Sequence, residues 1–291
     1  MKALAWNIGF GGLGRAASFW PDGGAFGRPS SRAEVSGNVA GIIATLRAVD
    51  ADILLLQEVS RGGLLSRGVD IMAALTEAFP GHCASFQHDA SLGVLGLNWP
   101  LSHGKATLTK DPHSLCAPGA NGPADTRYYG VLTKHHGSLT VKLDTPDLVV
   151  ANVHLDPYGA DAEAKLAGAR AALNAARDRA AKHVLCGGDF NMLLAPTIWE
   201  HTRPASEIAW AVPFGPDGLP GDMVLHVDPT VPTNRSLDAP FQAGTSHQTV
   251  IDGFTSGPGI AVTAIRTLDL GFAHSDHNPV VIEFDLKGSD Q

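Results

Sequence analysis

Residues 52–59 read Asp-Ile-Leu-Leu-Leu-Gln-Glu-Val, and the expected fold is built outward from this stretch. A continuous apolar run of this kind is typical of a β-strand that is buried on both faces. The run ends on Gln57 and Glu58, so it brings an acidic side chain to the rim of a sheet. Similar apolar runs that contain or end on polar residues occupy 3–8, with Asn7, 148–154 and 184–189.

Helices and shorter strands surround these runs. Ser31 followed by Glu34 is a capping-box signature, and apolar residues then recur at helical spacing, which predicts a helix that ends near Asp50. Further helices are expected over about Val69–Phe79 and Ala160–Ala181. The other strands are expected over His82–Phe86, Gly93–Leu97, Tyr129–Lys134, Leu139–Leu143, Val250–Phe254, Ile260–Leu268 and Val280–Phe284. Residues 9–29 and 196–246 read as loops with few ordered pieces.

The order of these elements predicts an α/β fold. Strands are too numerous, and too irregularly interleaved with helices, for a simple alternation, so we expect two mixed β-sheets packed face to face with helices outside. No internal repeat, charge block or Pro/Ser-rich linker divides the chain. With 44% hydrophobic residues, a chain of 291 residues can bury one large core, and we predict a single domain over residues 1–291.

The composition limits the partners and the compartment. The formal charge of −8 repels polyanions, so contact with nucleic acid must be local or mediated by a metal, which counts against a non-specific nuclease. Three cysteines without metal-type spacing read as buried thiols in a reducing compartment. Neither a membrane span nor a signal-peptide core is present, so we expect a cytoplasmic protein without membrane insertion. No protein partner is evident.

Polar residues suited to one kind of chemistry gather at the ends of the apolar strands. They are Asn7, Glu58, Asn152, His154, Asp189, Asn191, Asp252, Asp276 and His277. Burying such groups is costly unless they pair or bind a metal, and sheet rims are where α/β enzymes place their sites. Glu58 and Asn7 supply oxygen ligands suited to Mg²⁺, with Mn²⁺ as an alternative, whereas the lack of paired His or Cys spacing argues against zinc. His277 can take a proton from water with Asp252 as its partner, and His154 is a second imidazole.

Six short motifs follow one another along the chain. They are Trp6-Asn7-Ile8, Leu56-Gln57-Glu58-Val59, Asn152-Val153-His154-Leu155, Gly188-Asp189-Phe190-Asn191, Ile251-Asp252 and Ser275-Asp276-His277-Asn278-Pro279-Val280. In this set and order they resemble the motifs of the endonuclease/exonuclease/phosphatase superfamily, which includes deoxyribonuclease I, apurinic endonucleases, inositol-phosphate 5-phosphatases and bacterial sphingomyelinases. One motif could arise by chance, but six in order are highly specific. The resemblance covers nearly the whole chain.

The resemblance implies a four-layer α-β-β-α sandwich, in which two mixed β-sheets lie between helices and the site lies at one rim. It also implies the metal ligands. Glu58 would bind the metal, with Asn7 as a ligand or close partner and Asp276 nearby.

Catalytic roles follow from the same resemblance. Asp189 and Asn191 would position the attacking water and the phosphate. His277, held by Asp252, would be the general base, and His154 would be the acid or a donor to the phosphate. Asp189 is the rival base, because superfamily members differ in the group that activates water.

Substrate contacts are expected from two more residues. Asn152 precedes His154 in the same strand, and Arg127 stands beside Tyr128-Tyr129, although an arginine that starts a strand is usually a solvated edge residue. Where many superfamily members carry Ser-Arg, this chain has Leu97-Asn98, so any contact from that arginine is absent. The loop over 9–29 is longer than in the nucleases and is similar to that of uncharacterised bacterial members.

Two other features of the sequence do not indicate a functional site. The stretch Gly9-Phe10-Gly11-Gly12-Leu13-Gly14 matches the dinucleotide-binding pattern, but that pattern must open a helix, whereas Pro21 and more glycines follow. The remaining histidines lack ligand spacing, and surface placement is expected for His82, His88, His103, His113, His135, His136 and His247.

The sequence thus predicts a Mg²⁺-dependent hydrolase of a phosphomonoester or phosphodiester. The low positive charge favours a small or lipid-type phosphoester as substrate. The first alternative is an endo- or exonuclease that acts on DNA or RNA. The second is a binding protein that kept the sheets but lost the chemistry, and the intact residue set argues against it.

Overall fold

The structure is a computed structural model of the chain. It describes residues 1–20, 23–25, 29, 31–92, 102–116, 126–128, 132–134, 137–157, 161–179, 182–202 and 212–288. The strand expected over residues 93–97 and the first part of the run over 129–134 lie outside the described residues, as does the end of the helix expected to reach Ala181.

Among the described residues, six strands form the first sheet, in the spatial order β16, β17, β1, β2, β5 and β3. They span Ile260–Thr267 (β16), Val280–Leu286 (β17), Lys2–Asn7 (β1), Ile53–Ser60 (β2), His103–Thr109 (β5) and Cys83–His88 (β3). β1 and β2 run parallel, and each other neighbouring pair is antiparallel.

The second sheet also has six strands within the described part of the chain, in the order β12, β15, β11, β10, β9 and β6. They span Val224–His226 (β12), Asp252–Ser256 (β15), His183–Asp189 (β11), Leu148–His154 (β10), Gly137–Leu143 (β9) and His113–Leu115 (β6). β10 and β11 are its parallel pair, and the rest is antiparallel. Each sheet is therefore mixed, as the sequence predicts.

Two smaller sheets lie beside these. One contains β4 (Ala90–Leu92), β8 (Leu132–Lys134) and β7 (Thr126–Tyr128), and the other is a two-stranded hairpin of β13 (Asn234–Arg235) and β14 (Gln248–Thr249). β13 falls in the stretch over residues 196–246 that the sequence indicates as mostly loop, and β14 follows just after that stretch. The hairpin becomes important because it reaches the rim at which the site lies.

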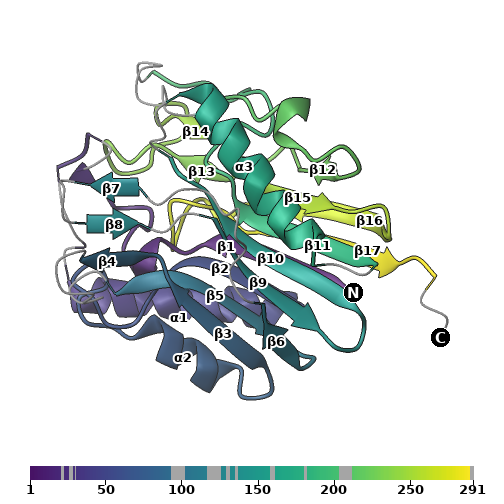
Figure 1. The fold of residues 1–291 in the computed structure, drawn as a ribbon. Coiled ribbons are helices and arrows are strands. Elements are labelled where there is room, and N and C mark those ends of the chain that lie inside the picture. The colour runs from purple at the N-terminus through teal and green to yellow at the C-terminus, as the bar shows by residue number, and fades with distance from the viewer. Residues whose placement is uncertain are drawn as a thin grey trace.

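Helices cover the outer faces of the sheets (Figure 1). α1 (Arg32–Val49) and α2 (Ile71–Ala78) pack on the first sheet, and α3 (Ala162–Arg177) packs on β9, β10 and β11. The Ser31 hydroxyl accepts a hydrogen bond of 3.0 Å from the Glu34 backbone N–H, which confirms the predicted cap of α1. Among the described residues, no helix is both long and apolar enough to cross a membrane.

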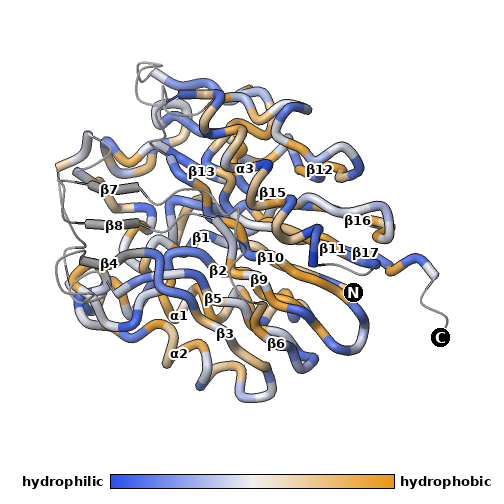
Figure 2. Tube along the Cα trace, viewed as in Figure 1, coloured by the Kyte–Doolittle hydropathy of each residue, from blue (hydrophilic) through white to orange (hydrophobic). Residues whose placement is uncertain are grey.

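The apolar runs are explained by burial on both faces. Along β1, Leu4 and Trp6 point toward the helices, whereas Ala3 and Ala5 point toward the second sheet. Val149 and Val150 of β10 divide in the same way between α3 and the first sheet. The protein therefore has the predicted four layers of helix, sheet, sheet and helix. Figure 2 shows hydrophobic residues along β9 and β10, and hydrophilic residues in the loop between them.

The structure also shows how the glycine-rich stretch over residues 9–14 folds and where two of the remaining histidines lie. Residues Gly9–Gly11 form a short 3-10 helix, η1, and among the described residues the first α-helix starts at Arg32, so the glycine pattern does not open a dinucleotide-binding helix. The predicted surface placement is wrong for His103 and His247, which are buried. His103 packs against the Phe10 ring, and His247 contacts His201, so the neighbouring loops cover both histidines.

Candidate active site

The ends of the two parallel strand pairs meet at one rim. Asn7 ends β1, Glu58 lies near the end of β2, and His154 and Asp189 end β10 and β11. Asn7 Nδ2 donates to Asp189 Oδ2 over 3.0 Å, which links the two sheets. His154 Nε2 lies 3.8 Å from Glu58 Oε1 and 3.8 Å from Asp189 Oδ2. Residues distant in the sequence thus form one polar cluster.

A β-bulge places Glu58 in this cluster. Leu56 pairs with Ala106 and Val59 with Gly104, so two residues of β2 stand opposite Lys105 alone. Glu58 has a φ of 55°, a left-handed conformation that is unfavourable for a residue with a side chain. Bulges of this kind occur beside active sites, where they redirect a side chain.

A tight turn after β11 holds Asp189 and Asn191. The Asn191 backbone N–H donates to Asp189 Oδ1 over 2.8 Å, and the Asn191 side-chain amide donates to the Leu155 carbonyl over 2.8 Å. Asn191 also has a positive φ, of 50°. Lys165 of α3 donates to the Asn191 carbonyl over 3.3 Å and thereby supports the turn from behind. The turn is therefore fixed by its own hydrogen bonds and by a buried lysine.

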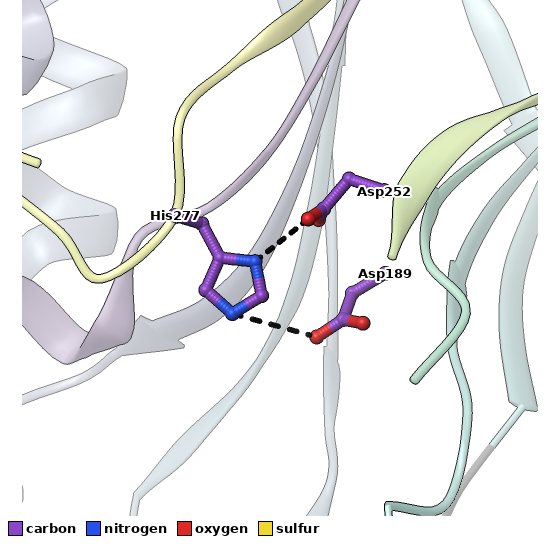
Figure 3. A group of neighbouring side chains, drawn as sticks. All are labelled: Asp189, Asp252 and His277. Carbon is purple, nitrogen blue, oxygen red and sulfur yellow. Dashed lines mark hydrogen bonds and ion pairs between the residues drawn. The ribbon is translucent and has the colours of Figure 1, made fainter. Parts of the chain in front are cut away.

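His277 stands between two aspartates (Figure 3). Its Nδ1 lies 2.8 Å from Asp252 Oδ2, and its Nε2 lies 3.9 Å from Asp189 Oδ2. Asp252 and Asp189 are neighbours because they pair across β15 and β11. Burial lowers the pKa of His277, but the carboxylates of Asp252 and Asp276 outweigh it and raise that pKa to about 10. The structure therefore brings together the predicted base and its predicted partner.

Asp276 and Glu58 form the carboxylate side of the cluster. Burial raises the pKa of Asp276 to about 6, and the Glu58 carboxylate adds to this effect while His277 opposes it. The Ser275 hydroxyl donates to Asp276 Oδ1 over 3.2 Å. Two nearby carboxylates at a buried rim repel each other unless a cation lies between them. This donor set fits a hard divalent ion such as Mg²⁺, which prefers oxygen ligands.

A second arrangement of ligands is less suitable for a cation. Single ligand atoms of Asp189, Asp252 and His277 lie within 4.8 Å of one another. However, the hydrogen bond between His277 Nδ1 and Asp252 Oδ2 already engages two of these residues. The Glu58 and Asp276 side of the cluster therefore fits a cation better.

The Asn7 side chain forms hydrogen bonds within the protein, whereas the sequence predicted it as a metal ligand or a close partner of one. Its Oδ1 accepts a hydrogen bond of 3.1 Å from the Gly9 backbone N–H, while its Nδ2 donates to Asp189. Both ends of the amide are thus engaged within the protein. In this geometry Asn7 orients Asp189, and its oxygen remains beside the cluster as a neighbour of the proposed cation site.

His154 is held by an ion pair that the sequence did not indicate. His154 Nδ1 lies 3.4 Å from Asp89 Oδ2, and Lys105 donates to the other oxygen of Asp89. Asp89 and Lys105 are both 1% exposed. Burial opposes ionisation of Asp89, but Lys105 and His154 hold the pKa of this carboxyl well below its usual range. His154 therefore faces the cluster through Nε2 and a buried negative charge through Nδ1.

Asn152 does not join the cluster. It is 0% exposed and lies between the two sheets. Its Nδ2 donates to the carbonyls of Leu56, over 3.1 Å, and Ala106, over 2.9 Å, and its Oδ1 accepts from Gln57 over 2.6 Å. The amide is fully used as a link between the sheets beneath the site. The substrate contact predicted for Asn152 does not fit this position, because no surface of the residue is accessible.

Replacing Asn152 by alanine is expected to lower stability and leave substrate affinity unchanged. The change removes the Asn152 donor from two buried carbonyls and one of the two acceptors of the Gln57 amide, and each buried group that is left unpaired costs about 1–3 kcal/mol. Urea unfolding should show a loss of about 3 kcal/mol or more. A KM that rises while the free energy of unfolding stays constant would instead support the predicted substrate contact.

Four more residues bear on the candidate site. Arg127 lies in β7, and its side chain is outside the described part of the structure. The residues near the site that the sequence did not indicate are Asp89, Lys105 and Asn234. Asn234 Nδ2 lies 3.0 Å from His277 Nε2. Asp89 follows directly after β3, so the rule of polar residues at strand ends could have found it. Lys105 and Asn234 have no such signal.

Known proteins support the family suggested by the motifs. The sequence model of the Endonuclease/Exonuclease/phosphatase family matches residues 4–277. The fold is similar to an endonuclease/exonuclease/phosphatase from Beutenbergia cavernae, with a TM-score of 0.59 and 20% identity over 99% of this chain and 72% of that one. It is also similar to the corresponding Bacteroides vulgatus protein, with a TM-score of 0.59 and 13% identity over 98% of both chains.

A third similar structure carries a nucleic acid. It is D. rerio TDP2 complexed with single strand DNA product, with a TM-score of 0.58 and 13% identity over 98% of both chains. No curated protein matches the chain significantly. Identities this low establish the fold alone, whereas the family match covers the first five motifs and the sixth as far as His277. This chain therefore belongs to the endonuclease/exonuclease/phosphatase family.

Proposed function

We propose that this protein is a Mg²⁺-dependent phosphoester hydrolase whose active site is the cluster around His277, Asp189 and Glu58. Family members are metal-dependent phosphoesterases and nucleases, which supports hydrolase activity at the general level. The proposal is carried by the convergence of three kinds of group at one rim. They are the His277 imidazole paired with Asp252, the carboxylates of Glu58 and Asp276, and the second imidazole, that of His154. Phosphoester hydrolysis needs this combination of a cation site, a base and polar donors.

Glu58 and Asp276 are the proposed ligands of the cation, with Asn7 beside them. Bound there, the cation would polarise a phosphoryl oxygen and offset part of the negative charge that raises the pKa of His277. Mn²⁺ prefers similar oxygen ligands and is the alternative ion.

His277 is the proposed general base. Its Nε2 takes a proton from water as the water oxygen bonds to phosphorus, and the bond from phosphorus to the leaving oxygen breaks on the opposite side. Asp252 keeps Nδ1–H oriented and stabilises the imidazolium that forms. Asp189 lies 3.9 Å from Nε2, close enough to orient the water, and remains the rival base.

His154 and Asn191 are the proposed contacts of the phosphoryl group. His154 Nε2 faces Glu58 and Asp189, while Asp89 holds the opposite side of its ring. In this position the imidazole can donate to a phosphoryl oxygen or supply the proton of the leaving group. Asn191 lies in the strained turn beside Asp189, where its amide group is close to the same reaction centre.

We favour a small or lipid-type phosphoester as substrate. The support is the formal charge of −8, because a polyanion must approach a negatively charged protein. A nuclease activity on DNA or RNA is the alternative, and the single strand DNA product bound to the similar TDP2 structure favours it.

A substrate panel in the presence and absence of metal tests the proposal. p-Nitrophenyl phosphate, bis-p-nitrophenyl phosphate, a phospholipid vesicle, single-stranded DNA and RNA are each incubated with Mg²⁺, with Mn²⁺ or with EDTA. We expect turnover of at least one phosphoester that stops with EDTA and returns with Mg²⁺. Glu58→Gln should lower this turnover by about 10²-fold or more while the fold is retained, because the variant loses a charged ligand at a rim.

The control variant is Glu283→Gln, which changes a half-exposed carboxylate on β17 that pairs with Arg266. It should retain wild-type turnover at every metal concentration. Wild-type protein that is inert on the whole panel with both ions would end the enzyme proposal. Turnover that is equal with EDTA and with Mg²⁺ would end the metal assignment.

A further inference from the structure

Asn234 contacts the proposed base from a segment to which no function has been assigned. It is the first residue of β13 and is 8% exposed. Its Nδ2 lies 3.0 Å from His277 Nε2, on the side of the ring opposite Asp252. Asp189 and Asp276 are each 3.9 Å from the same Nε2, beyond hydrogen-bond distance. Among the described residues, Asn234 is therefore the hydrogen-bond partner of the atom that would take the proton.

The backbone holds Asn234 firmly in this place. Asn234 forms an isolated β-bridge with His277, and the Arg235 N–H donates to the Asp276 carbonyl over 3.1 Å. The Asn278 N–H donates to the Thr233 carbonyl over 2.8 Å. The β13–β14 hairpin is thus attached to the 276–278 segment on both sides of Asn234. The amide is a preorganised group and not a mobile surface side chain.

The chemistry of the amide suits a phosphoryl oxygen. Asn234 carries two hydrogens on Nδ2, and the contact with His277 uses one. The other has no acceptor among the described residues, and Oδ1 has only a 3.5 Å contact from the Thr249 hydroxyl. A neutral donor at this distance from the base can bind a charged phosphoryl oxygen without adding charge to a site already rich in carboxylates.

We propose that Asn234 is a catalytic residue that donates a hydrogen bond to a phosphoryl oxygen of the substrate. This inference rests on the proposed function. When the His277 ring is neutral and carries its hydrogen on Nδ1 toward Asp252, the Asn234 amide can donate to the lone pair of Nε2 and keep the ring in place. When the phosphoryl group binds, the amide donates to it instead, and Nε2 becomes available to the attacking water. A single lone pair cannot accept from both partners, so this exchange is required for His277 to act as the base.

Two variants separate donor chemistry from shape. Asn234→Asp keeps the size of the side chain but replaces the donor by a charged acceptor, and Asn234→Ala removes both. We expect kcat/KM to fall by about 10²-fold in each, the usual cost of removing one donor to a developing charge. The inhibition constant of inorganic phosphate should rise, more for the aspartate than for the alanine. Gln248→Ala, in the adjacent strand of the hairpin, is the control and should stay within about twofold of wild type.

A binding readout separates this inference from the proposed function. The side-chain amide signals of Asn234 are assigned by NMR from their loss in Asn234→Ala, and inorganic phosphate is then added to the Mg²⁺-loaded wild-type protein. A shift of these signals supports the inference, whether or not turnover is found on the panel. Unchanged signals at saturating phosphate overturn it, as does wild-type kcat/KM in both Asn234 variants of an active enzyme.

Discussion

Replacing His277 by alanine is expected to lower kcat by about 10³- to 10⁴-fold, the upper part of the range for a residue that moves a proton. The imidazole is 4% exposed and lies between Asp252 and the centre of the cluster, so no other group can take its place without moving. Because the substrate contacts of the phosphoryl group remain, KM should change much less than kcat. Steady-state kinetics with the best substrate of the panel measures both constants.

The matched control for this variant is His183→Ala. His183 is also buried, and its ring contacts the backbone carbonyls of Asp147 and Lys287. It begins β11, the strand that ends at Asp189, so it lies about 20 Å from the site. His183→Ala should lose stability and keep kcat.

Asp252→Asn should lower kcat without removing the imidazole. A His277→Ala variant with kcat near the wild-type value would make Asp189 the general base.

Replacing Lys105 by methionine is expected to lower the free energy of unfolding by about 3–5 kcal/mol, because the change leaves a charged partner buried and unpaired. That partner is Asp89, which is 1% exposed and also contacts His154. Activity should fall as well, since Asp89 then takes up a proton more readily and no longer orients His154. Urea unfolding measures the first effect, and kcat measures the second.

Two further variants make this result specific. Lys110→Met removes a lysine that lies five residues further along the chain and pairs with Asp50 and Asp52 at the surface. It should lower the free energy of unfolding far less than Lys105→Met does. The double variant Lys105→Met with Asp89→Leu replaces the buried ion pair by apolar groups and should recover much of the stability. It should not recover activity, because His154 remains without its carboxylate. Recovery of both properties would show that Asp89 has no role beyond packing.

The sequence predicted the layers of the fold well because burial on two faces leaves a strong pattern. Strands such as β2 and β10 lie between helices and a second sheet, so they need continuous apolar residues. The N-terminal cap of α1 was equally predictable, as the hydrogen bond between Ser31 and Glu34 shows. Short strands were harder. β13 has two residues in a loop-like stretch, and its position depends on pairing with β14, which periodicity does not encode.

The position of individual side chains within the site was only partly predictable. His277 and Asp252 were expected to pair, and the structure places them 2.8 Å apart. Asn152 was expected to contact substrate as one of the polar residues near the end of the strand that also carries His154. Asn152 and His154 both point into the space between the sheets. Asn152 lies deeper, however, and its amide donates to the carbonyls of Leu56 and Ala106 in the other sheet.

By itself the sequence determined which segments are buried strands and which polar residues end them, because a carboxylate or imidazole next to an apolar strand is too costly to keep without a partner or a cation. Only the tertiary structure decided the partners themselves. Asp89 meets His154, Lys105 meets Asp89, and Asn234 meets His277. The members of these pairs lie 16 to 65 residues apart in the chain, and their contacts depend on how the two sheets pack and on the register within each one. Short-range sequence patterns carry no information about that packing.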